Sequence, residues 1–126
     1  MPERIQLSRR KGWRKPENTV VVARPSKWGN PFKITHEHCD EAEVGGMCWV
    51  VRRADRRPAF AHESTVREAR AVAVEEFRTY LRAGLLSFTV EGVRAELAGK
   101  NLACWCPLDQ PCHADVLLEI ANESGT

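Results

Sequence analysis

The sequence contains no run of eighteen apolar residues, which excludes a membrane-spanning helix. Its first residues, Met1–Arg4, lack the apolar core of a secretory signal peptide, so we expect a cytoplasmic protein. It also lacks a large excess of charge of one sign, since the net charge is +2. That value is too small to demand a nucleic-acid partner and does not oppose one. A membrane partner is therefore not expected, and nucleic acid stays open.

The five cysteines are too few and odd in number for a full disulfide framework. Because the cytoplasm keeps thiols reduced, they are better interpreted as core thiols, metal ligands or reactive groups. No internal repeat or domain boundary is visible, and 126 residues is the usual size of one domain. We predict a single domain over residues 19–122, preceded by a basic arm over residues 1–18. The arm is either poorly ordered or docks on phosphates with Trp13 as an anchor.

Short apolar strands and amphipathic helices predict an α/β domain with a mainly parallel sheet packed by helices. Val20–Ala23 and Asn101–Cys106 read as buried, central, neighbouring strands of one sheet, and Met47–Arg52 also has strand character. A first helix is predicted over Val66–Arg82, where it follows a capping box at Thr65 and packs its Phe77 stripe on that sheet. A second is predicted over Val90–Leu97. A third should run to Asn122, with Pro111 in its first turn and Asp109 or Gln110 as its cap.

The segment Leu102–Asp115 carries three cysteines and a histidine at the end of a predicted strand and the start of a predicted helix. Because side chains alternate along a strand, Cys104 and Cys106 should face the same way. Cys112 and His113 should begin the helix, where amide groups and the helix dipole favour an anion or a thiolate. The sequence therefore places a functional site at this junction.

Three interpretations of these residues compete. In the first, Cys112 is a nucleophile with a low pKa, and His113 adjusts that pKa or accepts the proton of the thiol. Cys106 then helps to bind the ligand. Alternatively, Cys104, Cys106, Cys112 and His113 hold a zinc ion, although this spacing is not that of a standard zinc ribbon. In the third interpretation, the cysteines are core residues and the histidine is structural. The first is preferred and assigns no metal.

A second motif, Arg24–Phe32, follows the first predicted strand and contains two prolines, a glycine and an asparagine, which predict a defined loop. If the two strands are parallel neighbours, this loop and the cysteine segment meet in one crevice. The loop supplies charge, hydrogen bonds and a stacking surface for a ligand through Arg24, Ser26, Lys27, Trp28 and Asn30. The alternative is a structural loop in which Trp28 and Phe32 fill the core.

These motifs resemble a known family. Leu97–Cys106, followed by Pro111–Asp115, is similar to the DUF4326 family of bacterial and phage proteins, and Arg24–Phe32 matches its other motif. The resemblance covers most of residues 14–122 and implies no reaction, because the family has no assigned function. The Cys-His pair also resembles, to a lesser extent, the close of the DUF488 family. Cys39 and Cys48 fall outside both motifs and are not assigned to the site.

We therefore expect an enzyme, or a degenerate enzyme, that acts on a nucleotide, a nucleoside or another phosphorylated small molecule. Cys112 and His113 would carry the chemistry, and Asp115 would orient His113 or bind a ribose hydroxyl. The alternatives are a non-catalytic nucleic-acid-binding module with a structural zinc and a phage-type protein-interaction factor. The sequence names no cofactor and no oligomeric state.

Overall fold

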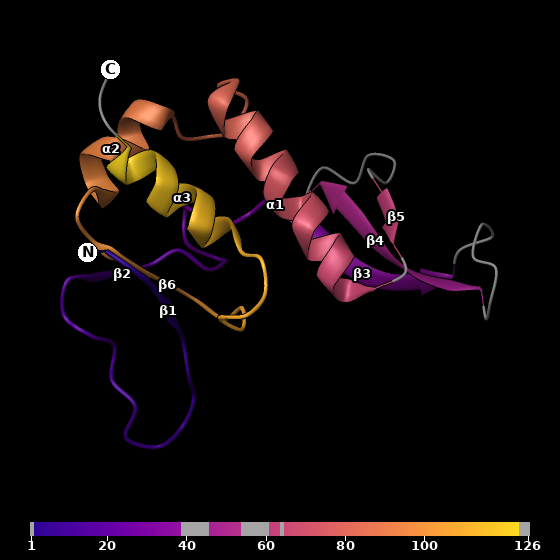
Figure 1. Cartoon of the computed structure of the whole chain (residues 1–126), viewed down its shortest axis with the longest axis horizontal. Coiled ribbons are helices and arrows are strands. Elements are labelled where there is room, and N and C mark those ends of the chain that lie inside the picture. The colour runs from indigo at the N-terminus through magenta and orange to yellow at the C-terminus, as the bar shows by residue number, and fades with distance from the viewer. Residues whose placement is uncertain (1, 39–45, 54–60, 64, 124–126) are drawn as a thin grey trace.

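The computed structural model describes residues 2–38, 46–53, 61–63 and 65–123. Within these residues it forms a small α/β domain with a parallel and an antiparallel sheet (Figure 1). No helix among them is long and apolar enough to cross a membrane. The elements in chain order are β1 (Arg4–Gln6), β2 (Thr19–Val21), β3 (Phe32–His38), β4 (Met47–Arg53), β5 (Ala61–Glu63), α1 (Val66–Arg82), α2 (Val90–Leu97), β6 (Asn101–Cys104) and α3 (His113–Asn122).

Strand β6 is the centre of the parallel sheet, with β1 on one side and β2 on the other. Val20 lies opposite Leu102 in the β2–β6 pair, and the amide of Val22 extends the pairing by donating to the Ala103 carbonyl at 2.9 Å. The prediction that β2 and β6 share a sheet is confirmed. The prediction that both are central is wrong for β2, because only β6 has a partner on each side.

The third strand of this sheet, β1, comes from the segment that the sequence assigned to a basic arm. Arg4 lies opposite Leu102 and Ile5 opposite Ala103, so this part of the arm is an edge of the sheet. The interpretation of residues 1–18 as a poorly ordered arm is therefore wrong at β1. A strand of three residues is too short to give a periodic signal, and its basic neighbours obscured it.

The antiparallel sheet has β4 in the centre, between β3 and β5. The strand predicted at Met47–Arg52 is β4, whereas β3 and β5 were not foreseen. In Figure 1, α3 lies over the parallel sheet and α1 extends from beside α3 to the antiparallel sheet. Helix α1 thus packs chiefly on β3, β4, β5 and α3, not on the parallel sheet as expected. Phe77 is fully buried there, with its ring 5.3 Å from the His113 ring.

The helices begin and end where the sequence places their signals, with one exception described below. Thr65 caps α1 by accepting a hydrogen bond from the Glu68 amide at 3.1 Å, and α1 spans the predicted Val66–Arg82. Gly84 follows with a φ of 75°, a conformation that glycine adopts without strain. Helix α2 also matches its predicted bounds.

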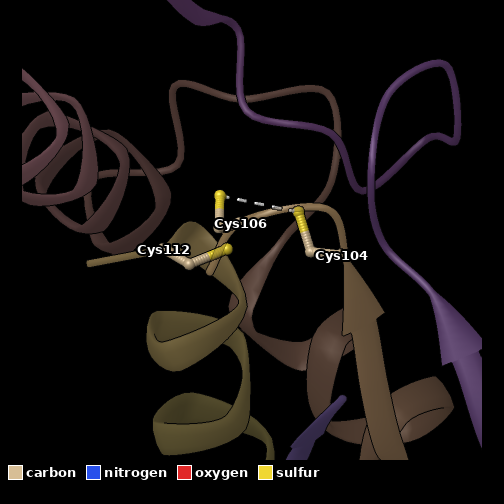
Figure 2. Close-up of side chains that lie close together, drawn as sticks. All are labelled: Cys104, Cys106 and Cys112. Atoms are coloured by element: carbon tan, nitrogen blue, oxygen red, sulfur yellow. Dashed lines mark hydrogen bonds between the residues drawn. The ribbon is translucent and has the colours of Figure 1, made fainter. Parts of the chain in front are cut away.

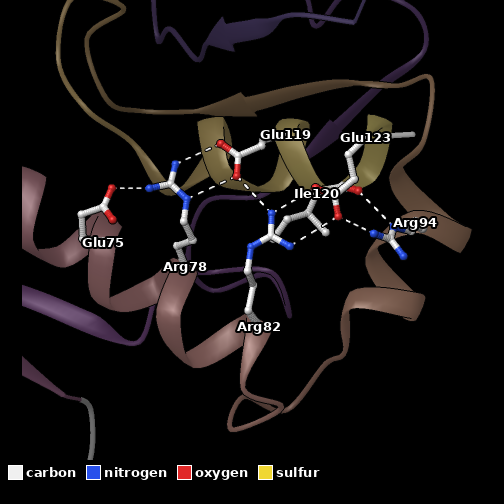
Figure 3. A network of polar contacts seen from close by, with 7 residues as sticks. All are labelled: Glu75, Arg78, Arg82, Arg94, Glu119, Ile120 and Glu123. Carbon is white, nitrogen blue, oxygen red and sulfur yellow. Dashed lines mark hydrogen bonds and ion pairs between the residues drawn. The ribbon is translucent and has the colours of Figure 1, made fainter. Parts of the chain in front are cut away.

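A network of arginines and glutamates joins the three helices on the surface (Figure 3). Glu119 of α3 accepts from Arg78 at 3.1 Å and from Arg82 at 3.2 Å, both on α1. Glu123, just beyond α3, accepts from Arg82 and from Arg94 of α2. The hydrogen bonds from Arg82 and Arg94 lower the pKa of the Glu123 carboxyl. Its contribution to stability is therefore present above the carboxyl's ordinary pKa and is lost as the pH falls through the lowered value.

Replacing Glu119 by Gln should lower the free energy of unfolding by about 0.5–1 kcal/mol at low salt, because exposed ion pairs contribute little and this one has two partners. The loss should shrink in high salt, which screens exposed charges. Urea unfolding at two ionic strengths measures both effects.

Glu75→Gln is the matched control, because within the part of the chain that the structure describes Glu75 pairs with Arg78 of its own helix and with no other helix. It should cost less than Glu119→Gln. A loss at Glu119 that salt leaves unchanged would contradict an electrostatic role for the network.

Candidate functional site

Helix α3 begins at the cysteine-histidine pair. Cys112 is the N-cap: its Sγ accepts from the Ala114 amide at 3.5 Å, and Asp115 Oδ2 accepts from the Cys112 amide at 3.3 Å. The sequence predicted a cap at Asp109 or Gln110 with Pro111 in the first turn, and this is wrong. The reciprocal bonds of Cys112 and Asp115 satisfy the free amides of the first turn, so the helix begins after Pro111.

Three thiols converge in front of this helix (Figure 2). The Sγ atoms of Cys104, Cys106 and Cys112 all lie within 4.8 Å of one another, and those of Cys104 and Cys106 are 3.9 Å apart. Strand β6 ends at Cys104, two residues earlier than predicted, but the two cysteines still face the same way, as expected. All three thiols are free, and Cys106 is the least buried. The predicted strand and helix therefore do bring the cysteines together.

His113 links the start of α3 to the end of β2. Its Nε2 lies 2.8 Å from the Val22 carbonyl oxygen, which can only accept, so Nε2 carries the proton and donates. Burial lowers the pKa of the ring and keeps it neutral. Nδ1 is then an acceptor, and it lies 3.7 Å from Cys112 Sγ. His113 is thus positioned to take a hydrogen bond or a proton from that thiol.

The three sulfurs shift one another's pKa values. Hydrogen bonds from Cys106 and Cys112 lower the pKa of Cys104. Hydrogen bonds with Cys104 and Cys106, together with burial, raise the pKa of Cys112. This direction is opposite to the low pKa predicted for Cys112 from the helix N-terminus, because the neighbouring sulfurs outweigh the Ala114 amide. Cys112 is also only 1% exposed, and this burial adds to the rise in its pKa.

A cavity of about 380 Å³ joins the thiol cluster to the second motif. Its wall includes Arg24 and Asn30 from the loop that follows β2, so the prediction that the two motifs share one crevice is confirmed. Arg24 Nη1 donates to the Asn30 carbonyl at 2.9 Å, and the Asn30 side chain accepts from the Phe32 amide at 2.8 Å. A Cβ on Gly29 would lie 2.6 Å from Arg24 Cγ, so glycine permits this close approach.

Four other residues assigned to the site lie elsewhere or have structural contacts. Lys27 is exposed, pairs with Glu96 at 3.0 Å, and does not line the cavity. Trp28 is buried and packs edge-on to Phe88, which fits the alternative of a structural loop. Ser26 Oγ is buried with no hydrogen-bond partner among the described residues. Asp115 caps α3 and pairs with Arg4, and within the described residues it makes no hydrogen bond to His113.

The structure adds two arginines that the sequence did not single out. Arg70 of α1 lines the cavity and donates to Gln110 at 3.1 Å. The hydrogen bond with Cys104 raises the pKa of the Cys106 thiol, and the charge of Arg70 opposes that rise. Arg4 of β1 donates to the carbonyls of Pro107 and Leu108 at 3.1 and 2.6 Å. Arg70 sits on the predicted amphipathic helix, where its phase was the only available signal. No sequence signal indicated a role for Arg4.

Of the remaining cysteines, Cys48 lies on β4 outside the cluster, and Cys39 falls outside the described residues.

Replacing Arg4 by Met should lower the free energy of unfolding by about 1.5–3 kcal/mol, the range for hydrogen bonds to a charged group. The Arg4 side chain is 8% exposed and holds the loop between β6 and α3. Its loss removes a donor from the Leu108 carbonyl and one of two donors from the Pro107 carbonyl, which also accepts from the Gln110 amide. Urea unfolding measures the change.

The matched control is Arg10→Met, since Arg10 is an exposed arginine of the same segment. It should change the unfolding free energy by less than about 0.5 kcal/mol. Equal losses for the two variants would show that Arg4 is an ordinary residue of a solvated arm.

Comparison with known proteins agrees with these motifs. The family model DUF4326, described as a domain of unknown function, matches residues 5–123, which include both the loop and the cysteine segment. No curated protein and no solved structure matches the chain. The similarity to DUF488 stays a prediction. The match spans nearly all of the 126 residues, and the chain therefore belongs to the DUF4326 family.

Proposed function

We propose that the chain is a small enzyme that binds a nucleotide or another phosphorylated small molecule in the cavity and acts on it at the thiol cluster. The observation that carries this proposal is the charge of the cavity wall. Among the described residues that line it are two arginines, Arg24 and Arg70, and no carboxylate. A wall with this composition attracts an anion.

The size and the remaining wall of the cavity favour a small molecule over a nucleic-acid strand. A volume of about 380 Å³ falls within the range of about 300–1,000 Å³ found for small-molecule sites. Phe32, Trp49 and Trp105 add aromatic surface to the wall. Such surfaces stack on a base or a sugar, which suits the nucleotide class that the sequence predicted.

The two arginines approach the thiols from opposite parts of the chain. Arg24 belongs to the loop after β2, and Arg70 belongs to the first turns of α1. Within the described residues, Arg24 donates through Nη1 to the Asn30 carbonyl, and Arg70 donates through Nη1 to the Gln110 side chain. A guanidinium has five N–H donors, so each retains donors for the oxygens of a phosphate.

The thiols form the reactive end of the cavity. All three cysteines line it, and Cys106 is the one that is only partly buried. Because the pKa of Cys112 is raised and that of Cys104 is lowered, the charge that meets a ligand belongs to the cluster and not to Cys112 alone. His113 supports the cluster as the neighbour of Cys112 and a potential proton acceptor.

Arg70→Ala should weaken binding of a phosphate or nucleotide ligand by about 1.5–3 kcal/mol, the range for hydrogen bonds to charged groups. This is roughly a ten- to hundredfold rise in Kd. Arg24→Ala should weaken it by a similar amount and also loosen the loop, because it loses the bond to the Asn30 carbonyl. Calorimetric titration with a panel of nucleotides and inorganic pyrophosphate measures binding, and thermal melts separate the two effects.

Lys27→Ala is the matched control, since it removes a positive charge from the same loop but outside the cavity. It should leave Kd within about twofold at physiological salt, where distant exposed charges are largely screened. If no member of the panel binds wild-type protein, or if Lys27→Ala costs as much as Arg70→Ala, the cavity is not the anion site.

A further inference from the structure

The thiol cluster has the spacing of a metal site. A tetrahedral zinc ion with Zn–S bonds of about 2.3 Å holds its sulfur ligands about 3.8 Å apart. The Sγ atoms of Cys104 and Cys106 are 3.9 Å apart, and all three sulfurs lie within 4.8 Å of one another. A disulfide needs a separation of about 2.05 Å, so Cys104 and Cys106 are not bonded to each other.

The three sulfurs come from three different local structures that converge on one point (Figure 2). Cys104 ends β6, Cys106 belongs to the turn that follows, and Cys112 is the N-cap of α3. Cysteines that only fill a core need no common focus, because their apolar contacts are non-directional. Cys104 is held by the parallel pairing of β6 with β1, and Cys112 is held by the capping box of α3.

We propose that Cys104, Cys106 and Cys112 bind one zinc ion as thiolates, with the fourth coordination position facing the cavity. Binding releases three protons to solvent, and the zinc-thiolate group carries a net charge of −1. All three cysteines line the cavity, so the open position is directed to the same space as Arg24 and Arg70. Structural zinc sites use four protein ligands, whereas catalytic sites keep one position for water or substrate.

His113 supports one ligand without joining the set. It is absent from the group of residues whose ligand atoms lie within 4.8 Å of one another. Its Nε2 is fixed by the Val22 carbonyl and its Nδ1 lies 3.7 Å from Cys112 Sγ. The proposed site therefore has three thiolate ligands, in place of the four ligands, including His113, of the sequence-based alternative.

This inference deepens the proposed function in one respect and rests on it there: an oxygen of the anionic ligand, or a water molecule that attacks it, would take the fourth position. A metal in that position acts as a Lewis acid or lowers the pKa of a bound water. The three-thiolate site itself does not depend on which ligand enters the cavity.

The first test is the metal content of the full chain, expressed with zinc and purified without chelator. We expect about one zinc per chain by elemental analysis, consistent with a single three-thiolate site. Cys106→Ser should reduce the zinc content at least tenfold, and Cys48→Ser, on β4 outside the cluster, should leave it unchanged. Wild-type protein without zinc, or equal zinc in both variants, overturns the site.

Because a cysteine variant can also misfold, alkylation of folded wild-type protein provides an independent test. Cys106, the least buried of the three, should label slowly as isolated and much faster after a chelator removes the metal. Far-ultraviolet circular dichroism confirms that the chelated protein is folded. Fast labelling before chelation would contradict coordinated thiolates.

The open fourth position is tested with cobalt in place of zinc and inorganic phosphate as the probe. Three thiolates should give a sulfur-to-cobalt charge-transfer band and the visible bands of tetrahedral cobalt. Phosphate should change the visible bands and leave the charge-transfer band in place. Bands that phosphate does not change overturn the open position. The anion site is judged separately, from pyrophosphate binding to Arg70→Ala and Lys27→Ala, so failure of the metal and failure of the proposed function are distinguishable.

Discussion

The parallel pairing of β6 with β2 is the constraint on which the site depends. It brings the carboxyl ends of the two strands to one edge of the sheet, so the chain that follows each strand enters the same space. After β2 comes the loop with Arg24 and Asn30, and after β6 come the cysteines. The hydrogen bond from His113 to the Val22 carbonyl then fixes the start of α3 against the end of β2. Without this pairing the two motifs would be separate surface features.

The electrostatics of the cavity follow from this arrangement. The neighbouring sulfurs, together with burial, raise the pKa of the Cys112 thiol, and a charge that forms in the cluster needs a partner. Arg24 and Arg70 supply positive charge beside the sulfurs, and a zinc ion would supply more at their centre. With zinc bound by three thiolates, one negative charge would face two guanidiniums, which leaves the site able to attract a further anion. The attraction for that anion therefore comes from Arg24 and Arg70, because the zinc-thiolate group itself carries a charge of −1.

The parts of the structure that were predictable had strong local signals. Helix α1 was predicted to the residue, because Thr65 and Glu68 form a capping box and Gly84 follows the last turn. The two motifs were correctly joined, because two apolar strands and a helix imply a parallel sheet. The parts that failed depend on contacts distant in sequence. Strand β1 is short and exists because β6 offers it a partner, and Arg4 gains its role from carbonyls about a hundred residues away.

The assignment of roles within the site shows the same division. Lys27 was assigned by its charge and its place in the motif, but its side chain points to Glu96 on α2 and not to the cavity. Arg70 was missed because it looks like any exposed arginine of an amphipathic helix, and only the packing of α1 brings it to the cysteines. The reversal of the Cys112 pKa has a similar origin, since the helix N-terminus is a local feature and the two other sulfurs are not. The position of the site was therefore predictable from the sequence, whereas the role of each residue in it depends on contacts between distant parts of the chain.

The account claims that one cavity joins a metal-binding thiol cluster to two anion-binding arginines, and a crystal structure tests this claim most directly. Diffraction data from zinc-loaded protein grown with inorganic phosphate should be collected on both sides of the zinc absorption edge. The account predicts an anomalous peak about 2.3 Å from the Sγ atoms of Cys104, Cys106 and Cys112. It also predicts a phosphate between that peak and the guanidiniums of Arg24 and Arg70. An empty space among the three sulfurs, with phosphate bound only on the outer surface, would contradict it.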